Sequence, residues 1–166
     1  MILDEKDCLI LNILQINCRV SLTELSKKVG ISIDAVNKRI KKMQKNNIFW
    51  PKIQIRPRNF GFNTIVDVKV KLQYNSKEDV DKFIGYLRAH PRVSEIFSVS
   101  GNWDLSLVII AKDPLDLGEI TNEIRYKFGN IISSWTESMT TNSYKFEYYD
   151  LAKLMGYSTA KVKPDF

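Results

Sequence analysis

Residues 21–43, Ser-Leu-Thr-Glu-Leu-Ser-Lys-Lys-Val-Gly-Ile-Ser-Ile-Asp-Ala-Val-Asn-Lys-Arg-Ile-Lys-Lys-Met, decide the fold of the N-terminal part of the chain. Ser21 is followed three residues later by Glu24, which predicts a capping box at the start of a helix. Gly30 tolerates the positive φ at which this helix would stop, and Ser32 is placed to cap a second helix. Two capped helices around a tight turn are typical of a helix-turn-helix, whose second helix fits a DNA major groove.

The predicted second helix separates apolar from charged residues. Val36, Ile40 and Met43 recur at i, i+4 and i+7, which predicts an inward face. The carboxylate of Asp34 repels phosphate, but it favours a helix N-terminus and can accept from a cytosine amino group. The residues that we predict to face DNA are Ser21, Ser32, Asp34, Asn37, Lys38, Arg39, Lys41, Lys42 and Lys45. The alternative is an ordinary solvated basic face.

These residues have different expected roles. Asn37 and Lys38 lie early on the exposed face, and we predict that they contact base edges. Lys41 and Lys42 are predicted to reach phosphate. Arg39 either reaches phosphate as well or braces the turn structurally.

Charge is segregated along the chain. Residues 1–58 carry a net charge of +7, whereas residues 59–166 carry −1. A segregated positive patch attracts a polyanion by counterion release, so double-stranded DNA is the expected partner. An anionic membrane is the alternative, but the sequence has no basic amphipathic helix with a Trp- and Phe-rich apolar face.

Bulk properties agree with an intracellular protein. The chain has 166 residues, of which 44% are apolar, and this is enough for one or two domains. No apolar run approaches the roughly 20 residues that span a bilayer, and the charged start does not resemble a signal peptide. Cys8 and Cys18 form no C-x-x-C motif and are expected to be reduced thiols. We expect a cytoplasmic protein.

Enzyme chemistry has little support in the sequence. His90 is the single histidine, and it precedes Pro91 at a predicted helix end, where it would serve as a cap. The chain has no P-loop, G-x-G-x-x-G, G-x-S-x-G or metal-ligand cluster. We therefore expect no enzymatic activity, no cofactor and no metal.

The remaining patterns predict an α+β protein with two domains. Residues 1–47 are predicted as a three-helix, winged-helix-like helix-turn-helix domain, with a first helix from Asp4 to near Asn17. Residues 48–62 are a linker strand or hinge in which Pro51 bars a central sheet position. Residues 63–148 read β-α-β-β-α-β, a ferredoxin-like domain with both helices on one sheet face and a long last strand over residues 131–148. Residues 149–166 form an extension: Leu151, Leu154 and Met155 could pack as a short helix, followed by a loose tail from residue 158.

The second face of this predicted sheet has no helix to cover it. Ser and Thr crowd the last strand beside Trp135 and Met139. The face is either exposed to solvent or paired with a second copy of the domain, because half-apolar faces and edge strands invite symmetric association.

Several short motifs, in order, resemble the Lrp/AsnC family of feast/famine regulators from bacteria and archaea. They cover about five-sixths of the chain. The resemblance rests on Leu3-Asp4-x-x-Asp7, Asn17-Cys18-Arg19-Val20-Ser21, Glu24-Leu25-Ser26, Val29-Gly30-Ile31-Ser32, Val36-x-x-Arg39-Ile40-Lys41, Pro57-x-x-Phe60-Gly61-Phe62 and Ser100-Gly101-Asn102-Trp103-Asp104. Phe49-Trp50-Pro51 and Trp103 depart from the family's pattern.

The resemblance implies a DNA-binding transcriptional regulator. Its C-terminal domains would dimerise, often further into octamers, and a small molecule, commonly an amino acid, would bind between dimers. The residues that match this effector site are Gly101, Asn102, Trp103, Asp104 and Thr136. Asp104 would accept from an ammonium group, Thr136 would offer a hydroxyl and Trp103 an apolar wall. The alternative is a plain hairpin turn with a solvated Asp104.

Two other functions remain open from the sequence. Haem-biosynthetic decarboxylases are similar in architecture, but they carry histidine-rich and tyrosine-rich segments where this chain has only His90. A ligand-binding or partner-binding protein with an idle helix-turn-helix is the other, and the charge of +7 in residues 1–58 argues against it.

Overall fold

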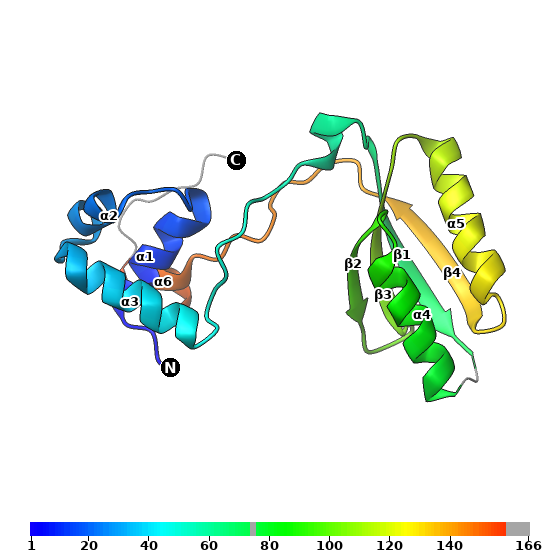
Figure 1. The fold of residues 1–166 in the computed structure, drawn as a ribbon, viewed down its shortest axis with the longest axis horizontal. Helices are drawn as coiled ribbons and strands as arrows, with labels where there is room; N and C mark the ends of the chain where they lie inside the picture. Colours follow the sequence, from blue (N-terminus) through cyan, green and yellow to red (C-terminus); the bar gives the residue numbers. More distant parts are fainter. Residues whose placement is uncertain (74–75, 159–166) are drawn as a thin grey trace. The chain divides into compact units, whose positions relative to one another are not determined.

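The computed structural model describes residues 1–73 and 76–158, and these residues divide into two units. The helical unit comprises residues 1–54 together with residues 144–158, and the sheet unit comprises residues 55–143. Both are drawn in Figure 1. Residues 159–166 of the predicted extension lie outside the described residues.

The helical unit begins with three capped helices: α1 (Glu5–Ile16), α2 (Leu22–Val29) and α3 (Ile33–Lys45). Ser21 and Ser32 accept the N3 backbone N–H of α2 and α3, as predicted. Gly30 ends α2 at φ 71°, a left-handed conformation that glycine adopts without a Cβ penalty. Two serine caps and one glycine, all within the motif itself, therefore specify this helix-turn-helix.

One predicted detail of the caps is wrong. Glu24 does not return a bond to the backbone of Ser21; its carboxylate instead lies 2.7 Å from Lys28 Nζ, one helical turn further on. The reciprocal capping box is at α1, where Asp4 accepts from the backbone N–H of Asp7 and Asp7 accepts from that of Asp4.

The core of the helical unit uses the predicted inward face of α3. Val36 and Met43 are fully buried, while Ile31 and Ile40 are partly buried against the same cluster. The cluster consists of Leu9, Ile10, Leu11, Ile13, Leu25, Val29, Val36 and Met43. This core holds α3 with its opposite face outward.

The C-terminal part of the chain also belongs to the helical unit. A short helix, α6 (Leu151–Leu154), lies beside α1 in Figure 1 and packs against it. Ala152 is fully buried and Leu151 packs on the apolar core. The structure thus divides the chain differently from the predicted domain boundaries, because residues 144–158 join residues 1–54 rather than trailing the sheet.

Residues between α3 and the sheet are extended. Asn46 caps the end of α3, and Asn47 has a φ of 54°. Residues 49–56 form no strand, so the predicted linker is extended but unpaired. A 3₁₀ turn, η1 (Pro57–Phe60), follows and ends at Gly61.

The sheet unit has the predicted β-α-β-β-α-β order. Its elements are β1 (Thr64–Leu72), α4 (Lys77–Ala89), β2 (Val93–Ser98), β3 (Leu105–Ala111), α5 (Pro114–Phe128) and β4 (Ile132–Met139). The strands are antiparallel in the order β2-β3-β1-β4, which is the ferredoxin-like arrangement.

Helices α4 and α5 cover one face of this sheet. Alternate residues of β1, Val66, Val68 and Val70, are buried in the same cluster as Phe83 of α4 and Ile124 of α5. Because side chains alternate along a strand, the intervening residues of β1 lie on the opposite face, called the open face here.

The last strand is shorter than predicted. β4 ends at Met139, and Thr140 makes the final ladder bond, from its backbone N–H to the carbonyl oxygen of Ile65 at 2.8 Å. The neighbouring strand begins at Thr64, so β4 has no partner strand beyond this point. Arg58 binds the carbonyl oxygens of Thr140 and Thr141 where the chain leaves the sheet.

Over residues 1–73 and 76–158, none of the helices combines the length and apolar character that crossing a membrane requires.

Candidate nucleic-acid interface and sensor site

Helix α3 is held to α1 by one arginine. Arg39 Nη1 lies 2.6 Å from Oδ2 of Asp4 and 2.8 Å from Oδ1 of Asp7. The Asp7 side chain is 5% exposed and that of Arg39 is 31% exposed, so this ion pair is largely shielded from water. The geometry matches the bracing role that the sequence left open for Arg39.

The same contact shifts two pKa values. Burial alone would raise the pKa of Asp4, but the bonds from Arg39 and from backbone N–H groups lower it below its usual value. The bonds to Asp4 and Asp7 raise the pKa of Arg39. Asp4 and Arg39 therefore stay charged around neutral pH.

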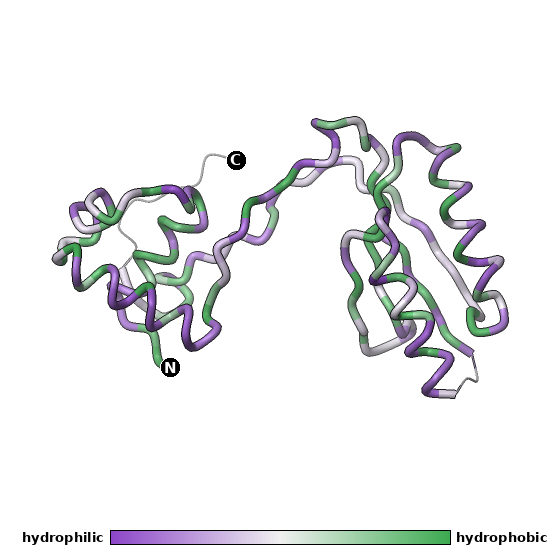
Figure 2. The backbone as a smooth tube through the Cα atoms, in the orientation of Figure 1, coloured by the Kyte–Doolittle hydropathy of each residue, from purple (hydrophilic) through white to green (hydrophobic). Residues whose placement is uncertain are grey.

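Of the residues predicted to face DNA, the exposed side of α3 carries Asp34, Lys38, Lys41, Lys42 and Lys45. Lys38 lies 2.8 Å from Asp34 one turn earlier, and the two side chains are 76% and 70% exposed. The bond to Asp34 raises the pKa of Lys38. Figure 2 shows how hydrophilic and hydrophobic residues alternate along this helix. Asp34 therefore partly neutralises the positive charge at the start of α3.

Further along α3 the positive charge has no counterion in the described chain. Lys41, Lys42 and Lys45 are exposed, and no described carboxylate lies within ion-pair distance of them. Asn37 is half-buried beside them. The structure therefore brings the predicted residues of α3 onto one helix, with Ser21 and Ser32 occupied as caps.

Sequence reasoning missed one residue that shapes this surface. Lys6 on α1 donates to the carbonyl oxygen of Val29 at 2.7 Å, at the C-terminal end of α2, where a cation is favoured. No local signal points to this contact, because the two residues are 23 positions apart.

In the sheet unit, the open face divides into an apolar and a polar part. Strand register places Ile65 opposite Ile110 and Asp67 opposite Val108. Phe97 on β2 is 52% exposed and lies opposite Ser106, at the border with the polar part. Toward the other end of β1 the face is polar, with Lys69, Lys71, Ser106 and Thr136.

Asp104 lies at this polar end and already has partners. Its Oδ2 accepts from the backbone N–H of Leu72 at 2.8 Å, and its Oδ1 lies 3.0 Å from Lys71 Nζ. These two bonds lower the pKa of Asp104, the backbone bond most strongly. The carboxylate is thus ionised and 37% exposed, rather than freely solvated as in the plain-hairpin alternative.

The other predicted effector residues lie in the turn before β3 and on β4. Gly101 turns the chain between β2 and β3 with φ 116°, a conformation that side-chain-bearing residues rarely adopt. Asn102 is exposed and Trp103 is half-buried in the same turn. Thr136 is exposed on β4 opposite Lys69, with β1 between it and β3. The turn residues are adjacent, whereas Thr136 lies two strands away.

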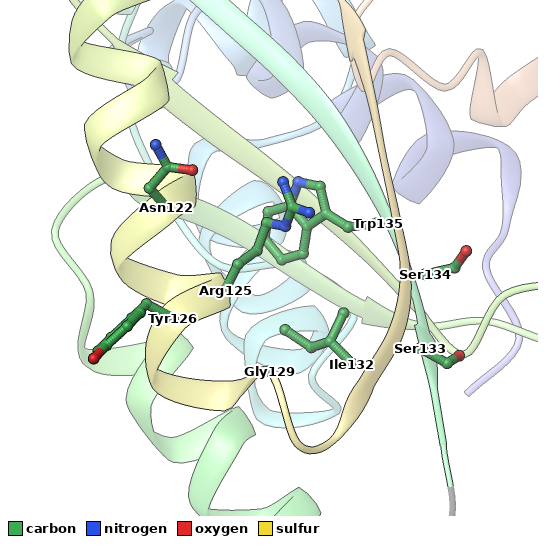
Figure 3. A pocket seen from close by; sticks show the side chains of 8 residues that line it. All are labelled: Asn122, Arg125, Tyr126, Gly129, Ile132, Ser133, Ser134 and Trp135. Atoms are coloured by element: carbon green, nitrogen blue, oxygen red, sulfur yellow. The ribbon is translucent and has the colours of Figure 1, made fainter.

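A separate open hollow of about 490 Å³ lies between α5 and β4. Figure 3 shows Arg125, Ile132 and Trp135 directed into this space, while Tyr126 points away from it. Trp135 Nε1 donates to Glu137 at 2.7 Å, which fixes the indole ring. No sequence pattern indicated this hollow, because it depends on the packing of a helix against a sheet edge.

His90 has the structural position predicted for it. Its backbone N–H donates to Leu87 at the end of α4, and its Nδ1 accepts from the backbone N–H of Arg92 at 3.2 Å. Among residues 1–73 and 76–158 no group of three or more His, Cys, Asp or Glu could hold a metal ion.

A helix-turn-helix with a basic outer helix face, joined to a ferredoxin-like domain, defines the class of DNA-binding regulators that carry a ligand-sensing domain. Comparison with known families agrees. Residues 3–44 match the AsnC-type helix-turn-helix domain, and residues 65–136 match the Lrp/AsnC ligand binding domain. The chain belongs to the Lrp/AsnC family of transcriptional regulators.

Individual relatives support this assignment. The chain is 33% identical over 134 residues to the HTH-type transcriptional regulator LrpA of Pyrococcus horikoshii, covering 78% of this chain and 88% of that protein. It is 28% identical to the regulator Ptr1 of Methanocaldococcus jannaschii, covering 78% and 86%.

Among solved structures, the fold is similar to that of transcriptional regulator NMB0573 from Neisseria meningitidis in complex with L-Met. The TM-score is 0.84 at 21% identity, covering 92% of this chain and 99% of the other. The fold is also similar to AsnC of E. coli, with a TM-score of 0.78 at 20% identity, covering 90% and 99%.

Proposed function

We propose that the chain binds specific double-stranded DNA through α2 and α3 and regulates transcription there. The observation that carries this proposal is the set of exposed lysines on α3 that lack counterions in the described chain, Lys41, Lys42 and Lys45, while Arg39 fixes the helix to α1. Phosphate groups would supply the missing counterions, with release of condensed cations. We infer a cytoplasmic location, because that is where the DNA of bacteria and archaea lies.

Contacts can be divided between bases and phosphates. Asn37 and Lys38 lie on the N-terminal half of α3, the part that reaches base edges in helix-turn-helix proteins. Lys41, Lys42 and Lys45 would contact phosphate, and Ser21 and Ser32 would lie near the backbone through the helix N-termini that they cap. Asp34 limits attraction to arbitrary DNA by pairing with Lys38. Arg39 is assigned to bracing.

The experiment that tests DNA recognition is a selection of bound fragments from the source genome. Recovery of fragments with a shared, approximately palindromic site would support the proposal, because a two-fold dimer reads two half-sites about 10 base pairs apart or a multiple of this. Recovery of fragments in proportion to their abundance would overturn it.

We also propose that the sheet unit dimerises through the apolar part of its open face. Ile65, Val108 and Ile110 are half-buried there, and Phe97, which lies opposite Ser106 at the border with the polar part, is exposed. Helices α4 and α5 pack on the other face. A second copy would bury the same patch on both partners. Assembly of dimers into an octamer is the further step that the family resemblance implies.

Replacing Phe97 with Asp in the full chain should produce monomers in sedimentation experiments, because a carboxylate would be buried without a partner. Tyr126→Asp is the matched control, since this side chain is 96% exposed on α5. Equal dimer dissociation constants for both variants would move the interface elsewhere.

We propose that the effector is an amino acid bound at the polar end of the open face. Asp104 and Lys71 present opposite charges 3.0 Å apart, which suits a zwitterion: the carboxylate would accept from the ligand ammonium and Lys71 would attract the ligand carboxylate. Gly101 and Asn102 would let the ligand approach the backbone, with Trp103 and Thr136 as further walls. The solved relative with bound L-Met makes L-methionine the first ligand to test.

Thermal melting with each of the twenty amino acids tests this site. A bound effector raises the melting temperature by preferential binding to the native state. Asp104→Asn should abolish the increase without changing DNA affinity measured in the absence of ligand. No increase with any amino acid would rule out this class of effector.

A further inference from the structure

Two carboxamides on α1 bind the C-terminal segment through paired hydrogen bonds. Asn12 Nδ2 donates to Asp150 at 2.9 Å, and its Oδ1 accepts from the backbone N–H of Leu151 at 2.9 Å. Gln15 Nε2 donates to the carbonyl oxygen of Tyr149 at 2.9 Å, and its Oε1 accepts from the backbone N–H of Tyr149 at 3.0 Å. Residues three apart lie on one helix face, so both pairs act at the same surface.

Apolar packing adds to these bonds. Ala152 is fully buried, and Leu151 packs on the core of the helical unit. Beyond α6, the hydroxyl of Tyr157 donates to the carbonyl oxygen of Leu3 at 3.2 Å. Residues 149–157, called the C-terminal clasp here, therefore hold α1 near both of its ends.

The end of α1 that the clasp holds at Leu3 is also the end that fixes α3. Asp4 follows Leu3 directly and caps α1, and Asp4 and Asp7 together bind Arg39 of α3. A displacement of the first turn of α1 would move both carboxylates that orient α3.

We infer that the C-terminal clasp is a positioning element for DNA binding: it fixes α1 and, through Asp4 and Asp7, the orientation of α3. This inference rests on the proposed DNA-binding function. The helical unit that presents α3 is then built from residues 1–54 and 144–158, and the sheet unit lies between these two segments in the sequence. When only a fraction of molecules holds α3 correctly, the apparent affinity falls by that fraction.

The test compares two full-chain variants that introduce the same residue into α6. Ala152→Glu cannot keep the clasp docked, because the side chain has no space at a fully buried position. Leu154→Glu makes the same change in charge at a position that is 68% exposed. Both variants are studied at a temperature at which their far-UV circular dichroism equals that of the wild type.

Two readouts decide the outcome. In Ala152→Glu, the amides of α1 and α3 should exchange with deuterium at least about tenfold faster, and affinity for sheared duplex DNA should fall about tenfold, as expected when one molecule in ten is competent. Leu154→Glu should match the wild type in both. Equal exchange in α3 for the two variants, or equal DNA affinity, would overturn the inference.

If Ala152→Glu does not fold, Tyr157→Phe replaces it. Loss of one hydroxyl bond should speed exchange in the first turn of α1 by about threefold, whereas Tyr144→Phe, whose side chain is 86% exposed, should change nothing. Equal exchange for these two variants would overturn the inference. Absence of DNA binding by the wild type would instead refute the proposed function, and exchange in α3 would still show whether the clasp orients this helix.

Discussion

Arg39→Ala should destabilise the helical unit far more than any lysine substitution on the same helix. The substitution leaves the carboxylate of Asp7, which is 5% exposed, without its charged partner, while Asp4 is 53% exposed and loses less. A charge-assisted hydrogen bond contributes about 1.5–3 kcal/mol, and an exposed one much less, so the free energy of unfolding should fall by about 2 kcal/mol. This corresponds to a fall of roughly 8–16 °C in the melting temperature of a unit of this size.

The assay is thermal and urea denaturation of the full chain, with Lys38→Ala as the control on the exposed face. Lys38→Ala should leave stability unchanged, because both members of its pair are solvated. Asp7→Ala combined with Arg39→Ala should lose less than the two single changes added together, since no buried carboxylate is left without a partner. Additive losses, or a loss for Arg39→Ala no larger than that for Lys38→Ala, would refute the bracing role.

Three further predictions concern pH, base contacts and the sheet unit. The pKa values of Asp4 and Asp104 are lowered in the folded state, so their contribution to stability is complete above the unfolded value of about 3.9 and is lost as the pH falls through the folded values. Urea denaturation between about pH 5 and 2 should show this loss of stability. The loss should be smaller in Asp104→Asn. Asn37→Ala should cost about 1–3 kcal/mol at a single base position of the selected site, measured by competition between operator variants, and an even loss over all positions would assign Asn37 to the backbone. Residues 55–143 expressed alone should remain folded and dimeric by sedimentation, because they contain the whole sheet and its open face; a monomeric fragment would contradict the proposed interface.

The sequence predicted those features that depend on neighbouring residues. Ser21 and Ser32 cap helices that begin one residue later, and the caps are confirmed because each hydroxyl accepts from a backbone N–H three positions ahead. Alternation of apolar and polar residues along β1 is likewise a local feature, and it determines which side chains of this strand are buried.

Features that depend on distant residues could not be read from the sequence. Polar and apolar residues continue past Met139, but β4 ends there because its partner strand begins at Thr64. The place of α6 depends on Asn12, 138 positions from Asp150 in the chain. Asp104 was predicted as an effector ligand, and its bond to the backbone of Leu72 depends on the pairing of β3 with β1.

The most direct test of DNA recognition by α3 is the salt dependence of binding to the selected operator. One variant replaces Lys38, Lys41 and Lys45 with Ala, and the control replaces three exposed lysines of the sheet unit, Lys77, Lys82 and Lys112. Net charge changes equally in the two proteins, so only the position of the lost lysines differs. The α3 variant should bind more weakly, with the slope of log affinity against log salt reduced by about 2 to 3, while the control keeps the wild-type slope. Identical slopes for the two variants would contradict the assignment of α3 as the DNA-binding helix.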